Sequence, residues 1–155
     1  MRIRKVLGVF LTLLFSATAG AVELNTNDQG IALHGYDPVA YVMELEPTMG
    51  DASFSTSHAG ATYYFASQGN LDMFLQSPDK FAPQYGGYCS YGVRVGKKFD
   101  VDPGAFSVVD NRLYMLLNKG THAIWLQERD KNIEIADRLW PSIRGVPADQ
   151  LTDDE

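Results

Sequence analysis

The sequence predicts a small single-domain α+β fold in which short antiparallel hairpins pack against short helices, with two helices at the C-terminal end. Two pairs of segments rich in β-branched and aromatic residues are each joined by residues that favour tight turns. Stretches with apolar residues at helical spacing lie between and after these pairs. Strands and helices therefore alternate as short units, without the longer spacing of a parallel sheet.

The N-terminal residues are typical of a secretory signal peptide. Three basic residues among the first five precede an apolar run over 6–15, and small residues at 19–21 form a cleavage site. The apolar run is too short to span a bilayer comfortably, which disfavours an uncleaved anchor. We therefore assign 1–21 to a signal peptide. We expect the mature protein in a bacterial periplasm, without stable membrane insertion.

The rest of the chain has the length of one domain, 22–145, followed by an acidic segment, 146–155, that we expect to be disordered. The formal net charge is −6 and becomes more negative when the basic leader is removed. This charge and the lack of a basic patch argue against nucleic-acid binding. A single cysteine excludes an intramolecular disulfide and a Cys-rich zinc cage.

The first half of the domain predicts a helix and a hairpin. Residues 22–29 are polar and are expected to be a loosely held lead-in. In 30–47 we expect a short strand, a turn and a short helix that Asp37 caps, with a proline at the first helical position. Residues 52–67 predict two strands joined at Ala59-Gly60.

A helix is expected next, with Ser67 or Asn70 as its cap and an apolar stripe at 71, 74 and 75. A further helical turn runs through Phe81. The pattern of 88–105 favours neither helix nor strand.

The C-terminal half predicts a second hairpin and two helices. The strands are expected at 106–109 and 112–117, joined by Asp110-Asn111, because Asx residues tolerate the left-handed backbone of a tight turn. Thr121 is expected to cap the first helix. The second helix is expected to end at Pro141.

Four motifs in this order resemble secreted bacterial proteins of the YHS-domain family: LHGYDPVAYV, GATYYFAS, SPDKFAPQYGGYCSYGV and NRLYMLLNK. The resemblance covers 30–143. The Tyr-His-Ser triplet of the family corresponds to Tyr88-Cys89-Ser90, so a thiol replaces the histidine. Proteins with such domains include copper-transporting ATPases, and the resemblance therefore implies heavy-metal handling centred on Cys89. Related treble-clef sites use several cysteines, and this chain departs from them by having one.

Cys89 is the first candidate for a functional residue. Thiolate is a ligand that Cu(I) favours, and imidazole can complete a site of two or three donors. Gly86-Gly87 can bring backbone N–H groups to the sulfur and favour the thiolate. His34 is the preferred second donor, ahead of His122. The leading hypothesis is an exported, non-enzymatic protein that binds copper and works with a periplasmic partner protein.

Two alternatives use the same cysteine differently. Free cysteine is among the most buried residue types, so Cys89 can be core filler in a structural or interaction module. The other alternative is a thiol-redox protein that forms mixed disulfides, or a disulfide-linked dimer, through Cys89.

Four residues are candidates for lining a pocket at the site: Tyr36, Asp37, Tyr88 and Tyr91. The alternatives are core packing for the tyrosines and helix capping for Asp37. A nucleophile pair of Cys89 with histidine, oriented by Asp37, satisfies the formal needs of catalysis. No catalytic motif accompanies it, so the sequence favours a role other than catalysis.

Overall fold

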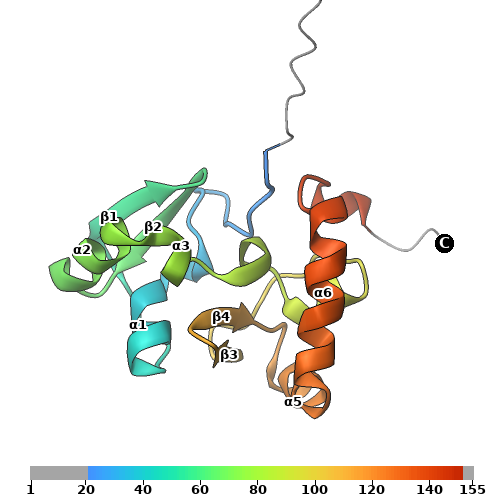
Figure 1. Ribbon diagram of the computed structural model, residues 1–155. Helices are drawn as coiled ribbons and strands as arrows, with labels where there is room; N and C mark the ends of the chain where they lie inside the picture. Colours follow the sequence, from blue (N-terminus) through green and yellow to red (C-terminus); the bar gives the residue numbers. More distant parts are fainter. Residues whose placement is uncertain (1–20, 152–155) are drawn as a thin grey trace, which may run out of the picture.

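A computed structural model describes residues 21–151 of the chain, so the predicted signal peptide lies outside the described residues except for Ala21. Figure 1 shows one group of elements on one side of the molecule and a pair of helices on the other, with a small hairpin between them. The first group is η1 (Leu33–Gly35), α1 (Pro38–Glu44), β1 (Asp51–His58), β2 (Ala61–Phe65), α2 (Gln68–Gln76) and α3 (Pro78–Phe81). The others are η2 (Gln84–Gly87), α4 (Ser90–Arg94), β3 (Phe106–Val109), β4 (Arg112–Met115), α5 (Lys119–Gln127), α6 (Arg129–Ile143) and η3 (Ala148–Gln150).

The α+β prediction is confirmed, and both hairpins lie where the sequence placed them. β1 pairs with β2, and β3 pairs with β4, in two separate antiparallel sheets. The second turn is left-handed at both Asp110 and Asn111, as the Asx residues predicted. The first turn has positive φ at Ala59 as well as at Gly60. Within 21–151, no helix has the length and apolar character needed to cross a membrane.

A buried carboxylate organises the first group of elements. Asp37 caps α1 as predicted: its Oδ1 accepts hydrogen bonds from the N–H groups of Val39 (2.7 Å) and Ala40 (3.2 Å). Its Oδ2 accepts from the N–H of Ala66 (2.8 Å) and from Nδ2 of Asn70 (2.6 Å). The side chain is 0% exposed. One carboxylate therefore joins the start of α1 to the end of β2 and to α2.

The helix boundaries differ from the prediction at two places. Ser67, one of the two predicted cap residues, caps α2. The cap of α5 is Asn118, whose side chain accepts from the N–H of Thr121, so Thr121 is not the cap. α6 continues through Pro141 to Ile143, where the buried Ile143 side chain joins the core. Proline disrupts a helix because it has no N–H to donate to the carbonyl four residues back and its ring crowds that carbonyl. At Pro141 this loss falls in the last turn of α6, with only Ser142 and Ile143 after it.

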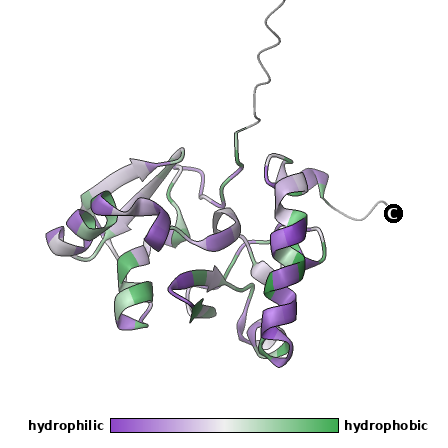
Figure 2. Ribbon diagram, in the orientation of Figure 1, coloured by the Kyte–Doolittle hydropathy of each residue, from purple (hydrophilic) through white to green (hydrophobic). Residues whose placement is uncertain are grey.

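One continuous core joins all the groups. Aromatic rings dominate it, with Tyr114 tilted against Trp125 and Tyr41 edge-on to Phe106. Figure 2 shows that α1 is mostly hydrophobic, whereas α6 alternates hydrophilic and hydrophobic bands. α1 is accordingly buried along much of its length, and α6 covers the core with one face.

Both ends of the described chain are held more firmly than predicted. Residues 22–25, which we call the N-terminal strap, bond through Glu23 to Arg144 (2.9 Å) and through Asn25 to Gly86 (2.8 Å). Residues 146–151 were assigned to a disordered tail, yet they contain η3, and Ala148 and Leu151 pack against the core. The prediction is corrected for this part, and 152–155 lie outside the described residues.

Replacing Asp37 by asparagine should lower the free energy of unfolding by about 3 kcal/mol. The substituted amide keeps one acceptor and turns an NH₂ group toward buried donors, which leaves N–H groups without partners. Urea denaturation measures the change. Asp72→Asn is the matched control, because Asp72 accepts only from Gln68 on the exposed face of α2. Equal losses in the two variants would contradict this account of Asp37.

Candidate functional site

Cys89 lies between η2 and α4, at the end of a tightly folded loop. The chain enters the loop through positive φ at Tyr85, Gly86 and Gly87, a backbone that glycine adopts at low cost. Cys89 then takes the N-cap position of α4, and its N–H donates to the carbonyl of Phe99 (3.0 Å). The sulfur is thus fixed by backbone on both sides.

One backbone N–H donates to the sulfur: that of Leu117, at 3.2 Å. The N–H groups of Tyr91 and Gly92, in the first turn of α4, make no cap hydrogen bond to the Cys89 side chain, but they too act to lower the pKa of the thiol. The sequence predicted that backbone N–H groups of Gly86-Gly87 favour the thiolate. Backbone N–H groups do act in that direction, but they belong to Leu117, Tyr91 and Gly92. Burial outweighs the amides and raises the pKa of the Cys89 thiol above its usual value.

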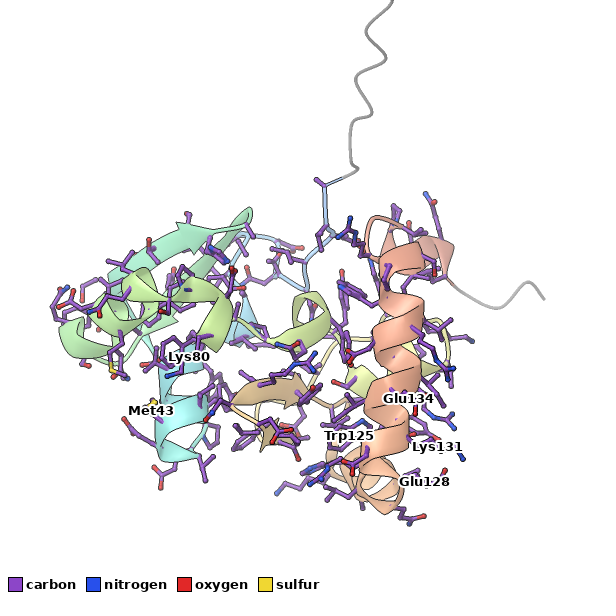
Figure 3. All side chains as sticks on the ribbon, in the orientation of Figure 1. Met43, Lys80, Trp125, Glu128, Lys131 and Glu134 are labelled. Carbon is purple, nitrogen blue, oxygen red and sulfur yellow. The ribbon has the colours of Figure 1, made fainter. Side chains whose placement is uncertain are left out.

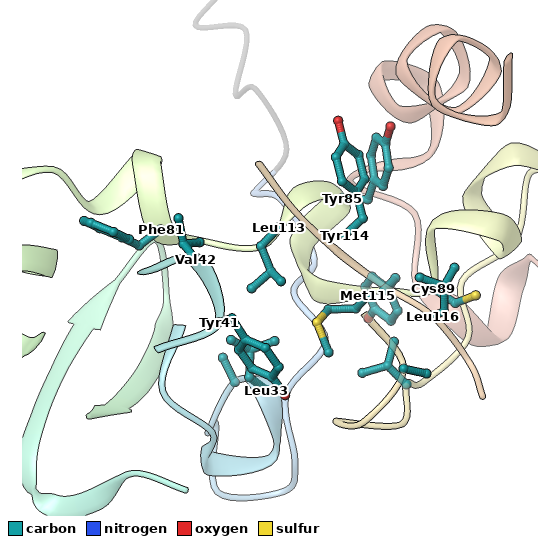
Figure 4. Close-up of a cluster of buried hydrophobic side chains, with 14 of the residues drawn as sticks. Leu33, Tyr41, Val42, Phe81, Tyr85, Cys89, Leu113, Tyr114, Met115 and Leu116 are labelled. Atoms are coloured by element: carbon teal, nitrogen blue, oxygen red, sulfur yellow. The ribbon is translucent and has the colours of Figure 1, made fainter. Parts of the chain in front are cut away.

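The thiol is sealed in the closed fold. Cys89 is 1% exposed, and Figure 4 shows it beside Leu116 at the edge of the hydrophobic cluster. In the same view the sulfur of Met115 points away from the sulfur of Cys89. Phe99 and Leu117 are the two residues whose backbones hydrogen-bond to Cys89. Both are apolar, and each is 40% exposed.

His34 lies on the surface in η1, where its backbone is left-handed (φ 55°). Its Nε2 is 2.8 Å from Oδ1 of Asp100, and its side chain is 41% exposed. Asp100 also accepts from Nδ2 of Asn25 and from the N–H of Val101. Burial opposes ionisation of Asp100, but these hydrogen bonds hold the pKa of its carboxyl below the usual value. Contacts through Asp100 therefore connect His34 to the segment that bonds to Cys89.

His122 lies in the first turn of α5, on a different part of the molecule from His34. Its Nε2 is 2.8 Å from Oγ of Ser107 on β3. Burial lowers the pKa of the His122 imidazole below its usual value, so the ring is neutral near pH 7. The structure thus gives each of these histidines a polar partner other than Cys89.

The predicted pocket-lining residues are distributed over the core. Tyr88 donates its hydroxyl to the carbonyl of Leu24 in the strap (3.4 Å), while Tyr91 lies under Arg94. Tyr36 packs near Tyr41. Asp37 is occupied by the four hydrogen bonds already described. Their role as a pocket lining stays a prediction.

The donors do not gather into a preformed metal cage. In the part of the chain that the structure describes, no three His, Cys, Asp or Glu side chains lie together in a way that could hold a metal ion. What the structure offers a soft metal is one thiol that accepts a hydrogen bond from the N–H of Leu117. A histidine or a group from outside the chain would have to supply the other ligands.

The sequence did not reveal Lys98, whose side chain is 0% exposed. Its ammonium donates to Oε2 of Glu23 (2.8 Å) and to the carbonyls of Arg144 (3.1 Å) and Val146 (2.6 Å). The rings of Tyr88 and Trp140 lie 5.1 and 5.4 Å from it. No local pattern marks this lysine, because its partners come from both ends of the chain.

Two surface hollows lie away from the sulfur. One of about 440 Å³ at the corner between α5 and α6 is lined by residues 126–131. Its charges pair with one another, Glu128 with Lys131 (2.9 Å) among them. A second of about 220 Å³ is bordered by strap residues 22 and 24, by Gly86 and by Trp140. The second hollow shows that solvent reaches the outer side of the strap.

Comparison with known families supports part of the resemblance. A family model described as YHS domain matches residues 45–85. The matched span covers β1, β2, α2 and α3 and ends at Tyr85, before Cys89. The correspondence of Tyr88-Cys89-Ser90 to the triplet of the family therefore stays a prediction. No curated protein and no solved structure matches the chain.

The stability of the fold should fall at alkaline pH. Because the pKa of Cys89 is raised in the folded state, folding stabilises the thiol below about pH 9, and this contribution is lost as pH rises toward the folded-state pKa. Burial raises the pKa of Tyr63 to about 12, which adds a loss in the same direction at higher pH. Urea unfolding between about pH 8 and about pH 10 should show the decline, limited to about 1.4 kcal/mol per pH unit for one group.

The matched control for the alkaline decline is Cys89→Ala, which has no proton to lose at this position. Its stability at neutral pH is lower because of the lost packing, but its decline over the same interval should be shallower. Parallel declines in the two proteins would show that the thiol does not contribute.

Proposed function

We propose that the protein is an exported, non-enzymatic metal-handling protein that binds a soft monovalent ion, Cu(I) foremost, through the sulfur of Cys89. The YHS-domain match at 45–85 supports the metal-handling part, because domains of this family are associated with copper and other heavy metals. The signal-peptide pattern at 1–21 supports export to a bacterial periplasm. The ion is cargo in this proposal, and no reaction is assigned to it.

The hydrogen bond from the N–H of Leu117 to the sulfur, together with the effect of the Tyr91 and Gly92 N–H groups in favour of the thiolate, is the observation that carries the proposal. A neutral thiol is a weak acceptor, and core filler needs no such donors. A thiolate accepts hydrogen bonds strongly, because they spread its charge. The N–H groups of Tyr91, Gly92 and Leu117 therefore suit the form of Cys89 that binds a metal.

His34 is the better candidate for a second ligand. Its bond to Asp100 places it beside the segment whose Phe99 carbonyl accepts from Cys89. It is also partly exposed, so its imidazole can turn toward an ion without leaving a core. His122 is held by Ser107 next to the second hairpin and would have to leave that contact.

Titration of the reduced protein with Cu(I), in competition with a coloured Cu(I) chelator, tests the proposal. The wild-type protein should bind one equivalent, and Cys89→Ser should bind about 100-fold more weakly, because a hydroxyl is a poor ligand for a soft ion. His34→Ala should weaken binding about tenfold, the size expected for loss of one contributing ligand.

His122→Ala is the matched control, since it removes an imidazole that the proposal leaves as the lesser candidate. Its affinity should stay close to that of the wild type. Equal Cu(I) affinity in the wild type and in Cys89→Ser would overturn the proposal. Circular dichroism of each variant checks that the fold is unchanged.

A second candidate function, a structural or interaction module in which Cys89 only packs, is favoured by the 1% exposure and the raised pKa of the thiol. The Cu(I) titration separates the two. A cysteine that only packs contributes no ligand, so Cys89→Ser would then bind Cu(I) as the wild type does.

A further inference from the structure

The N-terminal strap lies directly on the loop that leads into Cys89. The N–H of Asn25 donates to the carbonyl of Gly86, and its side chain donates to the carbonyl of Gly87 (3.1 Å). The carbonyl of Leu24 accepts from the hydroxyl of Tyr88. Three consecutive loop residues before the cysteine are therefore bonded to the strap.

The contact is too close for a larger residue at Gly86. A Cβ atom there would lie 3.0 Å from the carbonyl oxygen of Glu23 and 3.2 Å from Cδ2 of Leu24. At Gly87 a Cβ atom would approach Cβ of Asn25 at 3.7 Å. Gly86 thus serves the close contact with the strap besides providing the turn. At Gly87, where 3.7 Å is an ordinary contact, it is the positive φ of 83° that favours glycine.

The strap is fastened at one main point, the ammonium of Lys98. All three of its donated hydrogen bonds go to the chain ends: to Glu23 of the strap and to the carbonyls of Arg144 and Val146. Glu23 in turn accepts from the N–H of Ala148 (3.2 Å). A buried charge of this kind is costly to separate from its partners.

The fastening point is covalently linked to the cysteine's own hydrogen-bond partner. Phe99 follows Lys98 and accepts from the N–H of Cys89, and Asp100 accepts from Asn25 of the strap. Segment 98–100 therefore contacts both the strap and Cys89. A movement that frees the strap also releases restraints on the cysteine loop.

We infer that residues 22–25 are a detachable strap, latched by Lys98, whose release opens the loop that carries Cys89 to solvent. The strap follows immediately after the predicted cleavage site at 19–21, so in the processed protein it is the start of the chain and can peel from one end. Its significance for metal loading rests on the proposed metal role, and peeling from one end rests on the proposed export and cleavage. The contacts between the strap, Lys98 and the cysteine loop rest on neither.

Opening of the strap involves far less surface than global unfolding. It separates a few hydrogen bonds and the Lys98 cluster but leaves the hairpins, α1 and the aromatic core intact. Local openings of this kind have free energies between zero and that of global unfolding, and they depend weakly on denaturant. The reaction of Cys89 with a thiol reagent reports the opening directly.

The test measures the rate at which Ellman's reagent labels Cys89 in the full protein, over urea concentrations below the unfolding transition. In the wild type the urea dependence of the rate should be less than about half of the equilibrium m-value. Lys98→Met, which keeps an apolar stem, should label at least about tenfold faster. Asn25→Ala should also accelerate labelling, and it tests the strap if Lys98→Met does not fold.

Lys131→Met is the matched control, because Lys131 also pairs with a glutamate, Glu128, but on the surface. Figure 3 shows the two residues at the N-terminal end of α6. This variant should label at the wild-type rate. The inference would be overturned if the urea dependence of the labelling rate equalled the full equilibrium m-value and the rates of the variants followed only their global stability.

Labelling uses no metal, so the two proposals fail separately. If Cu(I) affinity is equal in the wild type and in Cys89→Ser while labelling follows the strap, the strap stands and the metal role falls. If Cu(I) binds through Cys89 but labelling requires global unfolding, the metal role stands and the strap is wrong.

Discussion

The buried ammonium of Lys98 is the interaction that closes this fold around its cysteine. Burying a charge removes its hydration, and the cost is offset only when every proton finds an acceptor. Here Glu23 and two carbonyls at the end of α6 accept the three protons, and two aromatic rings cover the rest. These partners come from the first and last segments that the structure describes. The ammonium is therefore fully paired only when both segments are docked.

The buried carboxylate of Asp37 plays the corresponding role in the first half of the molecule, but its partners are of a different kind. Two of its four hydrogen bonds go to the residues that follow it in sequence, as in any capped helix. The bonds of Lys98 all span at least 46 positions. A sequence pattern reports the first kind of contact and carries no trace of the second.

This difference explains how much of the fold the sequence could predict. The second hairpin and the caps at Asp37 and Ser67 depend on neighbouring residues, and they were predicted correctly. The cap of α5 was misplaced because Asn118 and Thr121 are both good capping residues within one turn of each other. The strap and α4 escaped prediction because distant partners hold them. At the site, Cys89 as the functional residue stays a prediction, and the sequence could not show that the N–H of Leu117 donates to its sulfur.

Two opposed effects set the pKa of the Cys89 thiol, and they come from different parts of the structure. Burial favours the neutral thiol, whereas the amides favour the thiolate, and burial prevails in the closed fold. A metal ion must displace the thiol proton, so a raised pKa weakens binding while the loop is shut. The N–H groups of Tyr91 and Gly92, which lower the pKa of the thiol, belong to the first turn of α4 and move with the cysteine, whereas the donor to the sulfur, Leu117, belongs to the segment after β4. An opening that keeps α4 intact would remove the burial and retain most of the amide stabilisation, so access to the sulfur and its ionisation would increase together.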